Sequence, residues 1–135
     1  MPANANNPTS VSLDIRMGSS SDPGWVDVNA SNGQPYSYCY TGGNNGNNGN
    51  LEFSVGGGNA ATTVGLIADA RYEFQGNVTF LNDPAGQLSS QGNAPRLRVV
   101  NDSCSAALPN GQYKITVLDT TANATIPCDP VIINK

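Results

Sequence analysis

Hydrophobic and polar residues alternate along most of this chain. Between 10 and 17 every second residue is apolar, from Val11 to Met17, and polar side chains stand between them. A period of two places the apolar side chains on one face of a β-strand and the polar ones on the other. No segment repeats with the 3.6-residue period of a helix over the roughly 11 residues that a typical helix needs. The pattern predicts strands over 10–17, 25–28, 36–40, 51–55, 62–68, 72–74, 78–81, 96–100, 112–119, 125–126 and 131–133.

Turn-forming residues separate these segments. The interruption Gln75-Gly76-Asn77 leaves three readings open: one bent strand, a tight hairpin, or a bulge at Gly76. Short strands divided by Gly, Pro, Asn and Ser clusters favour an antiparallel β-sandwich over a fold of alternating strands and helices. The fold class predicted is therefore all-β.

The chain is expected to form a single domain. Its length of 135 residues suits one two-layer core. We expect a flexible N-terminal segment over 1–9 and a sandwich over 10–135. The segment 41–50 (TGGNNGNNGN) predicts a mobile surface loop, because Gly and Asn tolerate positive φ and offer little to bury. The turn-rich stretch 82–95 is long enough for a functional loop.

Charge and hydropathy remove two classes of partner. Charged residues make up 12% of the chain, the net charge is −4, and there are six basic residues. These few cations cannot form the positive stripe that a phosphate backbone requires, so nucleic acid is not an expected partner. No apolar run approaches the roughly 20 residues that span a bilayer, so no membrane partner is expected. The first residues lack the basic and apolar regions of a signal peptide, which predicts a cytoplasmic protein unless a leader has been removed.

The absence of histidine is the most specific chemical constraint. It excludes Ser-His-Asp and Cys-His catalysis and every histidine-ligated metal site. Three cysteines leave at least one free thiol in the monomer. Cys104 and Cys128 form a disulfide if their strands are neighbours, although three pairings exist. Cys39 has no cationic neighbour in sequence and reads as an inert buried thiol.

The C-terminal end carries a short motif. A predicted strand over 113–117 (YKITV) is followed, after a polar stretch, by 128–134 (CDPVIIN). This ending resembles that of small bacterial proteins grouped as the DP-EP family, which finish in a strand and an Asp-Pro-x-Ile-x-Asn tail. The resemblance covers the last part of the chain only. It implies an immunoglobulin-like β-sandwich and carries over no established activity.

Aromatic residues are the candidate binding groups. Trp25 and the stripe Tyr36, Tyr38 and Tyr40 can stack on sugar rings if they are exposed, as in a lectin-like carbohydrate-binding protein. The alternative is that three tyrosines on one face of a strand belong to the core or to an interface.

Carboxylates offer two further chemistries. Asp83, Asp102 and Asp129 lie in or beside loops and are candidate calcium ligands, although Asp in turns more often bonds its own backbone. Glu52 and Glu73, the only glutamates, are the candidates for a carboxylate-dependent hydrolase. Each alternates with a phenylalanine, which favours the solvated face for both.

These observations predict a non-enzymatic β-sandwich that acts through its surface as a binding, assembly or structural module. The expected ligand is a carbohydrate or a protein, with no cofactor other than calcium. Exposed strand edges favour edge-to-edge pairing and hence a homodimer.

Overall fold

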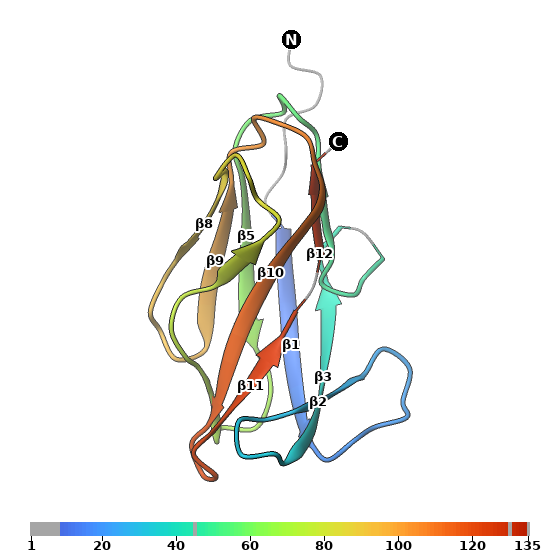
Figure 1. The fold of residues 1–135 in the computed structure, drawn as a ribbon, viewed down its shortest axis with the longest axis vertical. Coiled ribbons are helices and arrows are strands. Elements are labelled where there is room, and N and C mark those ends of the chain that lie inside the picture. Colours follow the sequence, from blue (N-terminus) through green and yellow to red (C-terminus); the bar gives the residue numbers. More distant parts are fainter. Residues whose placement is uncertain (1–8, 45, 130, 135) are drawn as a thin grey trace.

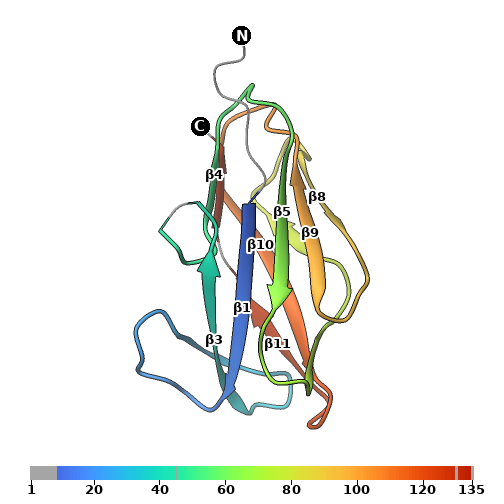
Figure 2. The ribbon, with the colours of Figure 1, turned by 180° about the vertical axis from the view of Figure 1, so that it is seen from behind.

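The computed structural model describes residues 9–44, 46–129 and 131–134, and the described chain is all strands and turns. Two sheets lie face to face (Figures 1 and 2). Among the described residues, no helix is long and apolar enough to cross a membrane. The strands are β1 (Thr9–Met17), β2 (Val26–Asn29), β3 (Pro35–Gly42), β4 (Leu51–Phe53), β5 (Ala60–Leu66), β6 (Tyr72–Phe74), β7 (Thr79–Leu81), β8 (Leu88–Gln91), β9 (Leu97–Asp102), β10 (Leu108–Asp119), β11 (Ala124–Cys128) and β12 (Val131–Asn134).

The first sheet has the order β2-β3-β1-β5-β9-β8, and the second has the path β11-β10-β12-β4 with β6 and β7 on β10. The predicted all-β, single-domain fold with mainly antiparallel sheets is confirmed. Among the described strands, two pairs are parallel, β1 with β5 and β12 with β4. Alternation in one strand cannot reveal these pairs, because it is the same for both directions. The immunoglobulin-like topology stays a prediction.

Strand β10 organises the second sheet. One of its sides pairs with β11 and β12, and the other pairs with β6 and β7. From Phe74 to Thr79 the chain advances five residues while β10 advances three, from Val117 to Lys114. The strands β6 and β7 thus follow one another along the same side of β10, with a bulge between them at Gly76, whose φ is 72° and whose carbonyl accepts a 3.0 Å hydrogen bond from Arg98 Nε. The tight-hairpin reading is wrong.

Two predicted segments need correction. Thr9 already belongs to β1, and 1–8 lie outside the described residues. Strand β8 lies inside the predicted loop 82–95. Its sequence, Leu-Ser-Ser-Gln, shows no apolar alternation, so the pattern does not predict it, and its pairing with β9 stabilises it.

The loop 41–50 is also anchored more closely than predicted. The Asn44 side chain bonds both backbone groups of Glu52, at 2.8 and 2.7 Å, and the Gly49 carbonyl accepts the Tyr113 hydroxyl at 2.6 Å. Gly49 is buried, and a Cβ there would lie 2.6 Å from the Tyr40 Cβ. Gly49 therefore packs on the core, whereas Thr41, Asn44 and 46–48 are exposed, as expected of a surface loop.

The tyrosine stripe of β3 lies in the core. Tyr36, Tyr38 and Tyr40 are 0%, 8% and 6% exposed, so they cannot form a surface platform for sugar rings. Tyr40 packs edge-to-face on Tyr38 and on Tyr113, with ring centroids 5.8 and 6.2 Å apart. The Tyr40 hydroxyl donates to the Cys128 carbonyl at 3.0 Å, so a side chain of the first sheet forms a hydrogen bond with the backbone of the second.

A buried carboxylate joins the two sheets. Asp119, at the end of β10, is fully buried and accepts a 2.6 Å hydrogen bond from the Tyr36 hydroxyl of β3. Arg71 binds it with two nitrogens, Nε and Nη2, each at 2.8 Å. The backbone amides of Thr121 and Ala122 donate to the same carboxylate. A bidentate Arg–carboxylate pair with additional donors is the arrangement in which a buried charge is stable.

This network changes the pKa of both acids. Burial alone raises the pKa of Asp119, but the hydrogen bonds from Arg71, Tyr36 and the two backbone amides outweigh it and lower the pKa from 3.8 to about 2. Burial, together with the hydrogen bond to Asp119, raises the pKa of Tyr36 to about 12. At neutral pH the carboxylate is ionised and the phenol is protonated.

Asp119→Asn tests the network. Because the folded pKa lies below the unfolded one, the charge contributes stability above about pH 4, and this is lost as the pH falls towards 2. The free energy of unfolding at pH 7 is expected to fall by about 2 kcal/mol or more. In urea titrations, the difference in free energy of unfolding between wild type and variant should become smaller as the pH falls from 4 to 2. The exposed-site control Asp27→Asn should change stability by less than about 0.5 kcal/mol; a gap independent of pH contradicts the assignment.

Candidate ligand-binding groove

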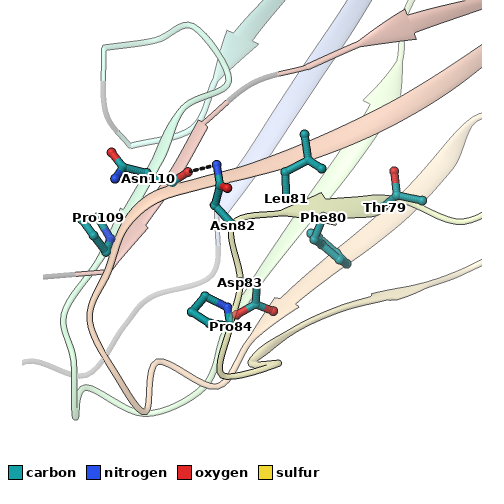
Figure 3. Close-up of a pocket in the computed structure, with 8 residues that line it drawn as sticks. All are labelled: Thr79, Phe80, Leu81, Asn82, Asp83, Pro84, Pro109 and Asn110. Atoms are coloured by element: carbon teal, nitrogen blue, oxygen red, sulfur yellow. Dashed lines mark hydrogen bonds between the residues drawn. The ribbon is translucent and has the colours of Figure 1, made fainter.

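A groove of about 1070 Å³ lies at the end of β7. Figure 3 shows its lining, which comes from β7, the corner that follows it and the start of β10. Its side chains are Thr79, Phe80, Leu81, Asn82, Asp83, Pro84, Pro109 and Asn110. The first six are contiguous in sequence and the last two lie on the neighbouring strand.

A left-handed residue shapes the corner after β7. Asn82 has a φ of 60°, a conformation that asparagine tolerates better than most residues. Its side-chain amide donates a 3.1 Å hydrogen bond to the Asn110 carbonyl, which ties the corner to β10 (Figure 3). The chain therefore turns sharply out of β7 and places Pro84 below the strand.

A β-bulge forms the opposite wall. In the pairing of β10 with β12, Leu108 to Gly111 spans three steps while Asn134 to Ile132 spans two. The extra residue lies at Pro109–Asn110. A proline is tolerated in a bulge because a bulged residue makes no ladder hydrogen bond, so the N–H that proline lacks is not needed there. Gly111 permits the close approach, since a Cβ there would lie 2.7 Å from the Ile132 carbonyl oxygen. The strand predicted over 112–119 therefore begins earlier, because residues 109–111 (PNG) lie inside β10.

The walls are mainly apolar. Leu81 is 49% exposed and Phe80 is partly buried, and both border the groove with the two proline rings. Asp83 is the acidic member, and its two oxygens accept the backbone N–H groups of Gln87 at 3.2 Å and Leu88 at 3.0 Å. The carboxylate thus stabilises its own turn. The groove can contact apolar side chains and can exchange hydrogen bonds through Thr79, Asn82 and Asn110.

The other predicted ligand groups lie apart from this groove. Trp25 is half-buried, and the Arg16 guanidinium covers its ring at 3.9 Å while pairing with Asp22 at 2.6 Å. One face of the indole is therefore occupied, and the core position of the tyrosines removes the rest of the proposed aromatic platform.

The candidate calcium ligands do not converge. Asp83 follows β7, Asp102 ends β9, and Asp129 lies between β11 and β12. Asp102 accepts the Cys104 N–H at 2.9 Å, as Asp residues in turns commonly do. The described residues contain no group of three or more His, Cys, Asp or Glu side chains placed to hold a metal ion.

The two glutamates are also separated. Glu52 lies on β4 and Glu73 on β6, with β12 and β10 between these strands in the second sheet. Three strand spacings amount to about 14 Å, which exceeds the separation used by paired glycosidase carboxylates. The pair does not form a two-carboxylate site.

All three thiols are free in the described structure, so the Cys104–Cys128 disulfide that the sequence left possible is not formed. Cys104 and Cys128 are buried, and Cys39 is partly buried. Burial, with the Asp102 charge, raises the pKa of Cys104 to about 12, and burial raises that of Cys39. These thiols are protonated at neutral pH, which makes them weak nucleophiles.

Comparison with protein-family models finds no match for this chain, and a search of curated proteins finds no relative. The similarity of the ending to the DP-EP family stays a prediction from its motif.

Gly111→Ala tests the bulge that forms the groove wall. The added methyl group meets backbone and the Leu108 side chain, so stability should fall by about 1–3 kcal/mol. Gly65→Ala is the matched control, because a Cβ there meets nothing within 4 Å, and its effect should be neutral or slightly stabilising. Urea unfolding of both variants measures the difference. Equal stabilities would show that the bulge tolerates a side chain.

The free thiols are tested by alkylation in denaturant without reductant. We expect intact-protein mass spectrometry to show all three cysteines modified. Under native conditions Cys104 and Cys128 should react far more slowly than Cys39, because they are buried. If only one cysteine is modified after unfolding, the other two form a disulfide and the assignment of three free thiols is wrong.

Proposed function

We propose that this protein is a non-enzymatic binding module that accepts an extended, uncharged polypeptide segment in the groove beside β7. One observation carries the proposal: among the described strands β7 pairs with β10 alone, and the groove lined by Phe80, Leu81 and the two prolines runs along β7 and its end. An unpaired strand edge presents backbone N–H and C=O groups that an extended peptide can bond.

The alternation of side chains supports this mode of binding. Leu81 and Thr79 project to one side of β7 and Phe80 to the other (Figure 3). A bound strand would therefore contact an apolar side chain on each face of the sheet, while its backbone follows the edge. Pro84 and Pro109 end the groove and have no N–H groups that compete for the peptide's carbonyls.

The electrostatics favour a neutral segment. The carboxylate of Asp83 already accepts two backbone N–H groups, and the lining contains no cationic side chain. An anionic peptide would lose hydration without gaining an ion pair, and a cationic one would meet only a carboxylate that already holds its own turn. The contacts should therefore come from apolar side chains and from the peptide backbone.

A polypeptide fits this groove better than a sugar. Carbohydrate platforms use exposed aromatic faces, and Phe80 is the one aromatic residue in the lining, with its side chain partly buried. A binding or assembly role of this kind agrees with the small sandwich fold and with the DP-EP resemblance, which implies no activity. The homodimer remains a separate prediction, to be checked by light scattering.

Selection from a phage-displayed library of random peptides on the full chain tests the proposal. We expect enriched peptides to alternate apolar and polar residues and to carry few charges. Leu81→Asp should weaken their binding at least about tenfold in calorimetry, because it places a charge among apolar groups. N-methylation of alternate peptide bonds in an enriched peptide should abolish binding in one register and spare it in the other.

Leu97→Asp is the matched control. Leu97 is 45% exposed, close to the 49% of Leu81, but it lies on β9 of the other sheet. Its variant should bind the peptides within about twofold of wild type. Failure to enrich any peptide, or equal binding by both variants, overturns the proposal. Concentration-dependent self-association that Leu81→Asp removes would identify a second copy of the chain as the partner.

A further inference from the structure

A second cleft, separate from the β7 groove, lies over β8 and β9. Its volume is about 270 Å³, and all its lining side chains are polar. They include the amides of Asn59, Gln91 and Asn101 and the hydroxyls of Ser89 and Ser103. The two sites share no lining residue.

Strand register brings these polar groups together. Ser89 lies opposite Asn101 across the β8–β9 pair, and Gln91 lies two residues further along β8 on the same face. On its other side Asn101 faces Ala61 of β5, whose short side chain leaves room above the sheet. The cleft therefore forms because a small side chain, Ala61, lies beside longer amide side chains on the adjacent strands.

An internal hydrogen bond orients two of the amides. Asn101 Nδ2 donates to Gln91 Oε1 at 3.0 Å. This contact uses the Asn101 amino group and the Gln91 carbonyl oxygen. The Asn101 carbonyl oxygen can therefore accept a hydrogen bond from a ligand, and the Gln91 amino group can donate one. Adjacent donor and acceptor groups of this kind match the paired hydroxyls of a sugar ring, since each hydroxyl both donates and accepts.

The base of the cleft is held by Gln87, which is 7% exposed. Its Oε1 accepts the N–H groups of Ser105 at 3.1 Å and Ala106 at 3.3 Å, and its Nε2 donates to the Ala106 carbonyl at 3.2 Å. The Gln87 carbonyl also accepts the Ser103 N–H at 3.0 Å. The loop after β9 is thus fixed before any ligand arrives, which lowers the entropic cost of binding.

The lining decides the class of ligand. It holds no cation, and the carboxylate of Asp102 disfavours phosphates and other anions. Because all of its lining side chains are polar, it is poorly suited to a hydrocarbon. Its volume corresponds to roughly nine water molecules, which is just below the range of drug-sized pockets. We propose that this cleft binds a single neutral sugar ring, such as the terminal residue of a glycan, through the amides of Asn59, Gln91 and Asn101.

NMR titration of the ¹⁵N-labelled full chain tests this site with four probes: glucose, galactose, mannose and N-acetylglucosamine. We expect at least one sugar to give saturable shifts centred on the side-chain NH₂ signals of Asn59, Gln91 and Asn101. Asn101→Ala and Gln91→Ala should each weaken binding roughly fivefold, the loss expected for about one net hydrogen bond. Gln75→Ala, an exposed amide outside the cleft, should leave the affinity unchanged.

Several outcomes overturn the site. These are no saturable shift with any of the four sugars, equal shifts with glycerol, or shifts that survive both cleft variants. The result is independent of the peptide groove, because Leu81→Asp should leave sugar binding intact and Asn101→Ala should leave peptide binding intact. Failure of one proposal can therefore be distinguished from failure of the other.

Discussion

The Asp119 carboxylate is the contact on which the rest of the structure depends. It is fully buried, and it receives the Tyr36 hydroxyl from the first sheet and a bidentate Arg71 at the end of the second. A buried charge is stable only when its partners occupy defined positions, so this network fixes where β10 lies against β3. Since β6, β7, β11 and β12 all pair with β10, the position of one strand sets that of the others.

Tyrosine hydroxyls extend the same principle along the core. Tyr40 reaches the Cys128 carbonyl, and Tyr113 reaches the carbonyl of Gly49 in the Asn- and Gly-rich loop. Their rings supply apolar area, while each hydroxyl donates to a backbone carbonyl. Burial raises the pKa of both phenols well above the range of physiological pH, so these bonds do not titrate there. A loop of small polar residues is thereby attached to the core.

Both candidate sites arise where regular pairing is interrupted or where small side chains occur. The left-handed Asn82 and the bulge at Pro109–Asn110 open the β7 groove, and Ala61 opens the amide cleft. The strands around them are hydrogen-bonded to their neighbours, which suits binding by a preformed surface. The Asp83 turn connects the two regions, because its carboxylate holds the backbone of Gln87 at the base of the cleft.

The amino-acid pattern by itself determined the all-β class and the position of most strands. The reason is that side chains alternate with a period of two in every strand, whichever strand it pairs with. It also excluded histidine chemistry. It could not determine that Tyr36 faces a buried carboxylate 83 residues away, that Leu-Ser-Ser-Gln forms β8, or that Cys104 and Cys128 stay unpaired. Alternation shows that one face of a strand is buried, but not what lies opposite it. Pairing, bulges and both clefts come from contacts between distant segments, so only the tertiary structure decided them.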